Sequence, residues 1–241
     1  MKPAAIHDFY SALRAANPEP RTELVYASPY QLLVAVILSA QATDRSVNAA
    51  SAALFRVAPD AAAMVKLGEA RLKHYIRTIG LFNSKASHII AASQLLLERH
   101  GGEVPADREA LEALPGVGRK TANVVLNAAF GAETIAVDTH LFRVANRTGL
   151  AKGATPRAVE EQLLAVTPKE FMRHAHHWLI LLGRYTCKAR SPLCAQCLVV
   201  RYCDFKHKVL ASGAAAKAPH TTRAPRTTRK ATRAARKVAR P

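Results

Sequence analysis

Apolar residues recur at intervals of three and four along much of the chain. The pattern is clearest in residues 6–13, 32–37, 89–97 and 159–166. Such spacing places the apolar side chains on one face of a helix. Proline, glycine and capping residues separate these stretches, and no stretch shows the alternation that is typical of a half-buried strand. The pattern therefore predicts an all-α protein.

The net charge changes this picture by indicating a partner. The chain of 241 residues has a formal net charge of +18, and residues 211–241, with three Lys, six Arg and no acidic residue, supply +9 of it. Residues 1–210 are therefore cationic by themselves. Because Lys and Arg neutralise phosphates with little regard to base sequence, we expect a nucleic acid as the partner. The alternative is a basic protein that its charge keeps soluble.

Composition also indicates where the protein acts and which part folds. The most apolar stretch, residues 32–38, is far shorter than the ~20 residues that a membrane-spanning helix needs. The first residues are amphipathic and lack the basic start and apolar run of a signal peptide. We therefore expect a soluble intracellular protein. Residues 211–241 have too few large apolar groups to offset the entropy of ordering, which predicts a disordered basic tail.

The cysteines are all close together in the sequence. Cys187, Cys194, Cys197 and Cys203 lie within 17 residues. Disulfides are rare inside cells, so this grouping predicts one metal centre. A compact loop around an iron–sulfur cubane fits the spacing, and a zinc site remains the alternative. The loop also carries Lys188 and Arg190, which either contact DNA or are solvated charges.

A glycine-containing turn lies in LPGVGRKTANVVLNAAFG, residues 114–131. Gly116 and Gly118 allow backbone N–H groups to approach an anion closely. The spacing excludes a P-loop, and Thr121 stands where the dinucleotide fingerprint needs a third glycine. The segment looks like a helix–hairpin–helix element that grips a DNA phosphate. A plain hairpin of two helices is the alternative.

A lysine in the first turn of a helix is unusual, because that end of the helix carries partial positive charge. Lys120 lies there, and the helix dipole, the neighbouring Arg119 and burial would each favour a neutral, nucleophilic amine. A phosphate contact is the alternative reading. Asp138, in TIAVDTHLFRVANR, precedes another helical stretch. We expect it to act both as the helix N-cap and as a fixed carboxylate beside the amine.

Taken together, these segments resemble the endonuclease III family of bifunctional DNA glycosylases, in the helix–hairpin–helix superfamily. The resemblance rests on residues 114–131, on TIAVDTHLFRVANRTG and HHWLILLGRYTCKAR, and on the four-cysteine loop. SPYQLLVAVILSAQATD and YIRTIGLFNSKA extend it over residues 5–207.

The resemblance implies two all-α domains that flank a DNA groove. A six-helix domain would span residues 22–132, with the helix–hairpin–helix at about 108–127. The N-terminal helix, residues 1–21, would pack with an iron–sulfur domain, residues 133–210. The four cysteines would hold a [4Fe-4S] cluster with a structural role. We further expect a monomer in the bacterial cytoplasm, associated with the nucleoid, and no membrane partner.

The resemblance also implies a reaction. Double-stranded DNA with oxidised pyrimidines, such as thymine glycol, or with abasic sites would be the substrate. Lys120 would displace the base and form a Schiff base, Asp138 would assist, and β-elimination would nick the strand. Predicted DNA contacts are Gln41 and Leu81, which would fill the gap left by the extruded base, and Gly116, Val117, Gly118, Arg119, Lys188 and Arg190.

Two other functions fit part of the pattern. The adenine-specific mismatch glycosylases share the fold and the cysteine spacing, but they lack the nucleophilic lysine and carry a large C-terminal recognition domain. An architectural DNA-binding protein would use the hairpin, the cysteine loop and the tail as clamps. The pairing of Lys120 with Asp138 argues against it, because non-specific binding needs no such pair. His174, His176, His177 and Trp178 are assigned to packing and to satisfied hydrogen bonds.

Overall fold

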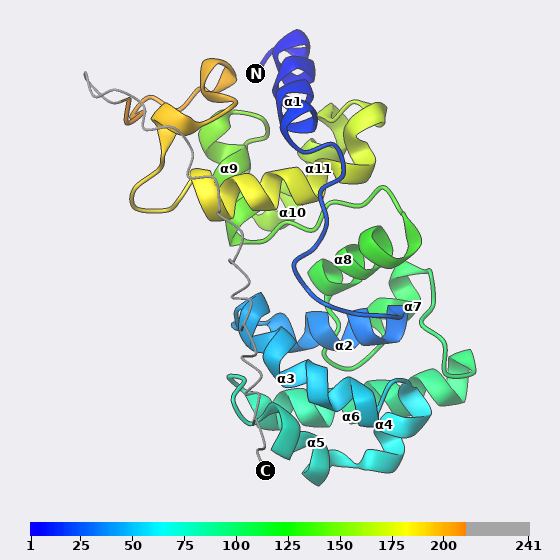
Figure 1. The fold of residues 1–241 in the computed structure, drawn as a ribbon. Coiled ribbons are helices and arrows are strands. Elements are labelled where there is room, and N and C mark those ends of the chain that lie inside the picture. Colours follow the sequence, from blue (N-terminus) through cyan, green and yellow to red (C-terminus); the bar gives the residue numbers. More distant parts are fainter. Residues whose placement is uncertain (211–241) are drawn as a thin grey trace, which may run out of the picture. The chain divides into compact units, whose positions relative to one another are not determined.

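The computed structural model describes residues 1–210, and the predicted basic tail lies outside the described residues. Residues 1–210 fold into helices joined by turns and loops, and no strand occurs among them (Figure 1). The helices are α1 (Pro3–Ala16), α2 (Pro29–Ser39), α3 (Asp44–Val57), α4 (Ala61–Leu67), α5 (Glu69–Ile76), α6 (Phe82–His100), α7 (Arg108–Glu112), α8 (Arg119–Phe130), α9 (Thr139–Thr148), α10 (Pro156–Val166) and α11 (Lys169–Leu181). Short helical turns follow at η1 (Leu182–Thr186), η2 (Cys194–Gln196) and η3 (Val200–Tyr202). The prediction of an all-α protein is confirmed.

Helix ends lie at the capping and breaking residues of the sequence. The Ser28 hydroxyl accepts the N–H of Gln31 at 3.2 Å and caps α2, which has proline in its first turn. Thr155 caps α10 in the same way. Gly101, with φ of +60°, ends α6 in the left-handed conformation that glycine adopts without steric cost. Local sequence thus decides where these helices begin and end.

Residues 1–210 bury two hydrophobic clusters. The first runs from Leu24 to Leu126 and joins α2 to α8. The second combines the apolar face of α1 with residues from Ile135 to Val199. We call residues 22–132 the hairpin lobe, and residues 1–21 together with 133–210 the cysteine lobe. These ranges are the predicted domains, and their boundaries stay predictions.

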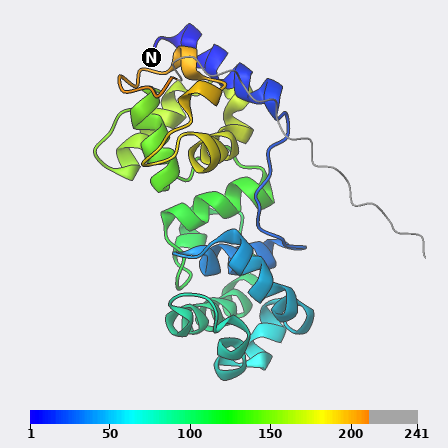
Figure 2. The ribbon, with the colours of Figure 1, turned by 60° about the vertical axis from the view of Figure 1, so that its left-hand side comes forward.

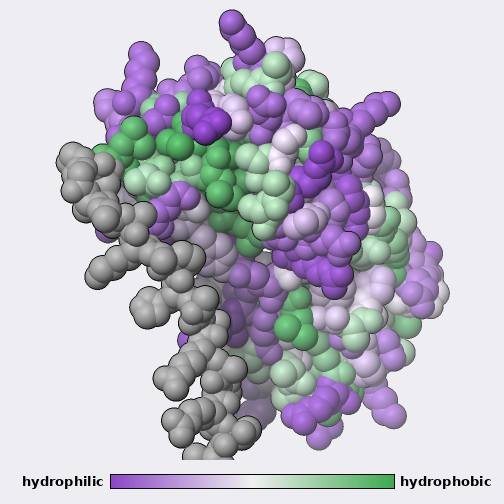
Figure 3. Space-filling view, turned by 45° about the horizontal axis from the view of Figure 1, so that its top comes forward, coloured by the Kyte–Doolittle hydropathy of each residue, from purple (hydrophilic) through white to green (hydrophobic). Residues whose placement is uncertain are grey.

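Figures 1 and 2 both show α8 on the side of the hairpin lobe that faces the cysteine lobe, and α1 beside α11. Hydrophilic side chains cover much of the face drawn in Figure 3, with hydrophobic patches between them. Within residues 1–210, no helix combines the length and the apolar character that crossing a membrane requires. The placement of α8 matters most for function, because this helix carries Lys120.

Candidate active site

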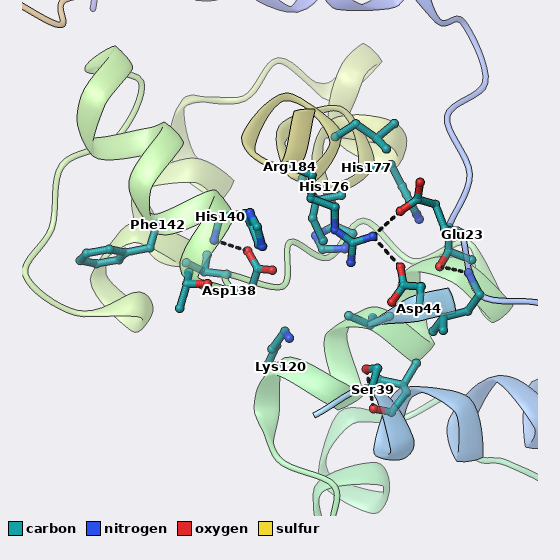
Figure 4. A pocket seen from close by; sticks show the side chains of 18 of the residues that line it. Glu23, Ser39, Asp44, Lys120, Asp138, His140, Phe142, His176, His177 and Arg184 are labelled. Atoms are coloured by element: carbon teal, nitrogen blue, oxygen red, sulfur yellow. Dashed lines mark hydrogen bonds and ion pairs between the residues drawn. The ribbon is translucent and has the colours of Figure 1, made fainter. Parts of the chain in front are cut away.

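A cavity of about 820 Å³ lies between the two lobes (Figure 4). The hairpin lobe contributes side chains from α2, α3 and α8, and the cysteine lobe contributes side chains from the start of α9 and from α11. The polar side chains that line the cavity include Glu23, Ser39, Gln41, Asp44, Lys120, Asp138, His140, His176, His177 and Arg184. The structure therefore brings Lys120 and Asp138, which the sequence predicts as a pair, to one cavity.

Lys120 is the second residue of α8 and lines the cavity together with Val124, one turn further along. Its side chain extends from α8 toward the part of the cavity where Asp138 lies (Figure 4). Lys120 is exposed, so the prediction that it is buried is wrong. The reason is the position of the first turn of α8, which borders an open cavity instead of the hydrophobic core.

Asp138 is the N-cap of α9, as the sequence predicts. Its Oδ1 atom accepts the backbone N–H groups of His140 and Leu141, each at 2.8 Å. The preceding residues, 134–137, are buried. Because the residues before it are buried and one carboxylate oxygen is held by two amides, Asp138 has a fixed orientation at the cavity wall.

The hairpin between α7 and α8 depends on glycine. Gly116 has φ of +78°, and a Cβ there would lie 2.8 Å from the Cβ atom of His88, so both conformation and space require glycine. Gly118 is exposed with open space where a Cβ would be. No side chain caps the start of α8. Val117 is buried in the hairpin lobe, which leaves only its backbone for contacts outside the protein.

Arg119 has a different environment from the one that the sequence predicts. Its guanidinium is bound to Glu160 of α10, in the cysteine lobe, at 2.7 to 3.1 Å. The charge that would disfavour a neighbouring ammonium is therefore paired with a carboxylate. A contact between Arg119 and DNA stays a prediction.

Gln41 and Leu81 share an unusual backbone conformation. In residues 1–210 they are the only non-glycine residues with positive φ, at 55° and 59°. Both are exposed, and Leu81 is 59% exposed. Such conformations cost about 1–3 kcal/mol each and are found at functional sites. The two residues that the resemblance implies as DNA-inserting are thus held in strained, solvent-facing turns.

A buried lysine connects these two turns, and sequence reasoning missed it. Lys85 is 4% exposed, and its Nζ donates to the carbonyl oxygens of Leu38 at 2.9 Å and Ala40 at 2.5 Å. Its backbone N–H donates to the carbonyl oxygen of Leu81 at 3.1 Å. Burial lowers the pKa of the Lys85 ammonium. No local pattern distinguishes Lys85 from a solvated lysine on a helix.

The four cysteines line one small, apolar cavity in the cysteine lobe. Two N–H groups approach their sulfur atoms: the backbone N–H of Phe205 lies 3.4 Å from Cys203 Sγ, and Arg147 Nη1 lies 3.9 Å from Cys187 Sγ. In residues 1–210, no group of three or more His, Cys, Asp or Glu side chains is arranged to hold a metal ion. The ligands and their metal stay a prediction.

Arginines of α9 hold the loop that contains the cysteines. Arg143 donates to the carbonyl oxygens of Cys187 and Gly183, at 2.9 and 2.8 Å. Arg147 donates to the carbonyl oxygens of Lys188 and Ala189, at 2.7 and 2.6 Å. Helix α9, which begins after Asp138, therefore supports the cysteine loop as well.

The exposed side chains of Lys188 and Arg190 lie in this loop, outside the cavity that contains Lys120. Because α9 fixes the loop backbone, their position on the surface depends on the same arginines. A role for them in DNA binding stays a prediction.

The cavity also contains histidines whose position the sequence did not reveal. His176 and His177 line it, and the buried Nδ1 atom of each has no hydrogen-bond partner among the described residues. The assignment of both to satisfied packing was therefore wrong for these atoms. Trp178 fits that assignment, since its Nε1 donates to the carbonyl oxygen of Asn17 at 2.7 Å. The two histidines are adjacent in a helical stretch, and nothing in that pattern indicates a cavity.

An ion-pair cluster forms another part of the cavity wall. Arg184 donates to Glu23 and Asp44, at 2.5 Å each, and Tyr185 donates to Glu23. Glu23 and Asp44 belong to the hairpin lobe, so this cluster connects the lobes. The residues are 140 or more positions apart in sequence from their partners, which is why no motif reveals the cluster.

His176 makes stability depend on pH. Burial, His177, Lys120 and Arg184 lower the pKa of His176 to about 3. His176 therefore binds a proton near pH 6.5 in the unfolded chain, whereas in the folded chain it stays neutral until the pH is much lower. The free energy of unfolding falls as the pH decreases from about 6.5 toward the pKa of the folded chain. We expect His176 to make the free energy of unfolding fall by up to about 1.4 kcal/mol for each pH unit of acidification. Urea unfolding of wild type and of His176→Gln at several pH values between about 7 and 5 measures it.

Titrating groups that do not contact His176 contribute equally to both proteins, so the difference between their slopes reports His176 and its coupling to His177. A His176→Gln variant that loses stability with pH as steeply as wild type would contradict the lowered pKa.

Comparison with known proteins adds the last observation. The pattern of a family described as "HhH-GPD superfamily base excision DNA repair protein" matches residues 34–169. Endonuclease III of Escherichia coli strain K12 and that of Haemophilus influenzae are each 60% identical over 202 residues, covering 84% of this chain and 96% of those proteins. A trapped covalent intermediate of Endonuclease III with DNA and a non-covalent complex each match with a TM-score of 0.79 at 40% identity, covering 85% of this chain and 96% of the other.

Proposed function

Because the chain belongs to the HhH-GPD superfamily of base excision DNA repair proteins, we propose that it excises oxidised pyrimidines and then cleaves the strand through Lys120. The chain is a bifunctional DNA glycosylase and AP lyase that acts in base excision repair. The proposal adds the substrate, of the thymine glycol type, and the residues that carry the reaction. The observation that supports it best is that Lys120 and Asp138 line the same cavity.

Access to a base in duplex DNA requires that the base leave the stack. Extrusion costs a few kcal/mol, and the cost is lower for a poorly stacked lesion such as a saturated pyrimidine. Gln41 and Leu81 insert where the base was. Their exposed, left-handed turns support this role, because the side chains stand out from the surface before DNA arrives.

Phosphate binding by the hairpin holds the damaged strand. The space around Gly118 and the uncapped start of α8 allow an oxygen of the backbone phosphate to approach several N–H groups. Lys188 and Arg190, exposed in the cysteine loop, add sequence-independent contacts. The substrate is double-stranded DNA that contains the lesion. A monomer and a cytoplasmic location stay predictions.

Lys120 then attacks C1′ of the extruded nucleoside as a free amine. The C1′–N bond breaks and the base leaves with a proton. The C1′–O4′ bond then breaks, which opens the sugar ring and leaves the amine bound to C1′ as a Schiff base. Loss of a proton from C2′ allows β-elimination, which breaks the bond to the 3′ phosphate. The exposure of Lys120 suits the entry of a nucleoside.

Asp138 has one carboxylate oxygen for structure and one for chemistry. Oδ1 is held by two backbone amides, whereas no hydrogen bond to Oδ2 occurs in residues 1–210. Oδ2 accepts the proton of the Lys120 ammonium before the attack and passes it to the departing base, after which the carboxylate stabilises positive charge on the sugar. This division follows from the N-cap geometry, which leaves the second oxygen directed away from α9.

The four cysteines would hold the [4Fe-4S] cluster in the cysteine loop. The fit rests on the apolar cavity that they line and on the N–H groups of Phe205 and Arg147 near sulfur, which are typical around such clusters. In residues 187–210 only Val199 is buried, so this segment has almost no hydrophobic core of its own. The cluster would cross-link the loop. Its role would be structural, because base excision needs no electron transfer.

Borohydride trapping tests the proposal. The protein is incubated with a duplex that contains one thymine glycol, and reduction of the Schiff base gives a stable covalent adduct. We expect the adduct and a nick 3′ to the lesion, and neither on an undamaged duplex.

Two controls identify the rival functions. Release of adenine from an A·G mismatch, without an adduct, would indicate an adenine-specific glycosylase. Binding to damaged and undamaged duplexes alike, without an adduct or nick on either, would indicate an architectural protein and would overturn the proposal.

A further inference from the structure

One edge of α8 is polar and faces the cysteine lobe. Arg119, Asn123 and Asn127 recur at intervals of four, and both asparagines are fully buried. Asn127 Nδ2 donates to the carbonyl oxygen of Arg173 in α11 at 3.3 Å, and Asn123 Nδ2 donates to Glu160 Oε1 at 3.1 Å. Intervals of four place side chains on one face of a helix, so these residues form a continuous polar contact.

Arg119 makes the strongest contact of this series. Its Nε lies 3.1 and 3.0 Å from Glu160 Oε1 and Oε2, and its Nη2 lies 2.7 Å from Oε1. The Glu160 side chain is only 5% exposed. The remaining nitrogen, Nη1, lies 3.9 Å from Glu112 Oε1. One guanidinium thus connects α7 and α8 of the hairpin to α10 of the other lobe.

The next residue of α8 is Lys120, which faces the cavity with Val124. Its proposed partner, Asp138, belongs to the lobe that Arg119 holds. A shift of the first turn of α8 against α10 therefore changes the distance and orientation between the Lys120 amine and the Asp138 carboxylate. Misplacement of a catalytic group by 1 Å can cost about 100-fold in rate.

We propose that Arg119 is a positioning residue, which the Glu160 carboxylate holds so that Lys120 meets Asp138, and is not a phosphate ligand. This inference rests on the proposed function. The Nε and Nη2 atoms are engaged by Glu160, and a phosphate that drew the guanidinium away would leave a buried carboxylate without its charge partner, which is strongly unfavourable. Arginine suits the role because its planar fork binds both carboxylate oxygens, which lysine cannot do.

Three variants and a control separate the two roles. Glu160→Gln removes the charge but keeps the shape, Arg119→Lys keeps the charge but loses the fork, and Arg119→Gln removes the guanidinium charge. The control is Glu161→Gln. Glu161 lies next to Glu160 in α10 and forms an exposed pair with Arg157, so its replacement leaves the lobe contact intact.

The single-turnover rate of Schiff-base formation is measured on an abasic duplex. The affinity and its salt dependence are measured on a duplex with a stable abasic analogue. We expect Glu160→Gln and Arg119→Lys to lower the rate about 10- to 100-fold, with unchanged affinity and salt slope. Glu161→Gln should match wild type in all three measurements.

Other results overturn the proposal. If Arg119 were a phosphate ligand, Arg119→Lys would keep the wild-type rate, and Arg119→Gln would reduce the salt slope by about one phosphate contact. A rate loss that only parallels a loss of folded protein, measured by circular dichroism, would indicate a purely structural pair. If the wild-type protein forms no adduct, the proposed function fails. If the wild-type protein forms the adduct and Glu160→Gln and Arg119→Lys form it at the same rate, only the positioning role fails.

Discussion

The Lys120→Gln variant is expected to form no borohydride-stable adduct and to nick an abasic duplex at least about 10³-fold more slowly than wild type. Removing a nucleophile leaves only binding and orientation to accelerate a reaction. Glutamine keeps most of the length of the side chain, and the exposed position of Lys120 tolerates the change without loss of packing. The variant should therefore fold and bind damaged DNA. Denaturing gel electrophoresis measures adduct and nick together.

Lys66→Gln is the matched control, because Lys66 is an exposed lysine in another helix, α4, and does not line the cavity. It should behave as wild type. An adduct that persists in Lys120→Gln would mean that a different amine attacks the sugar, and the assignment of the nucleophile would be wrong.

The second large effect concerns the cysteine loop. Cys197→Ser is expected to reduce the iron content of the purified protein by about 10-fold or more, since even weaker changes around a metal centre cost 10- to 100-fold in affinity. The visible colour should fade, and the free energy of unfolding should fall. Val199 is the only buried residue of segment 187–210, so apart from the hydrogen bonds of Arg143 and Arg147 to residues 187–189 little packing holds this segment in place.

Ser191→Ala, in the same loop but exposed, should keep the iron content and the stability of wild type. Iron analysis, absorbance and urea unfolding make the comparison. A wild-type protein that is colourless and contains zinc would contradict the iron–sulfur prediction, while the roles of Lys120 and Asp138 would be unaffected.

Helix positions and caps could be predicted from sequence because they depend on residues that are near one another. The spacing of Ile6, Phe9, Tyr10 and Leu13 predicts the buried face of α1, and Asp138 is the N-cap that its position before a helix indicates. The family resemblance and the presence of Lys120 and Asp138 at one cavity also follow from short motifs.

Contacts between distant residues could not be predicted in this way. Arg119 and Glu160 are 41 positions apart, and the partners of Arg184 are further still. The prediction that Lys120 is buried was wrong for the same reason, because whether a turn of a helix borders the hydrophobic core or a cavity depends on how the two lobes pack. Charge pattern alone treats Arg119 as a free cation, although a carboxylate of another helix neutralises it.

The buried ammonium of Lys85 joins the turns of Gln41 and Leu81, and this has a consequence for how lesions are found. Lys85 Nζ donates to the carbonyl oxygen of Ala40, next to Gln41, and the Lys85 N–H donates to that of Leu81, so one residue contacts both turns. If Gln41 and Leu81 insert as proposed, we therefore expect the two side chains to enter the duplex together. A damaged site would then have to admit both side chains at once, and intact, well-stacked DNA would resist this double insertion more than two independent ones.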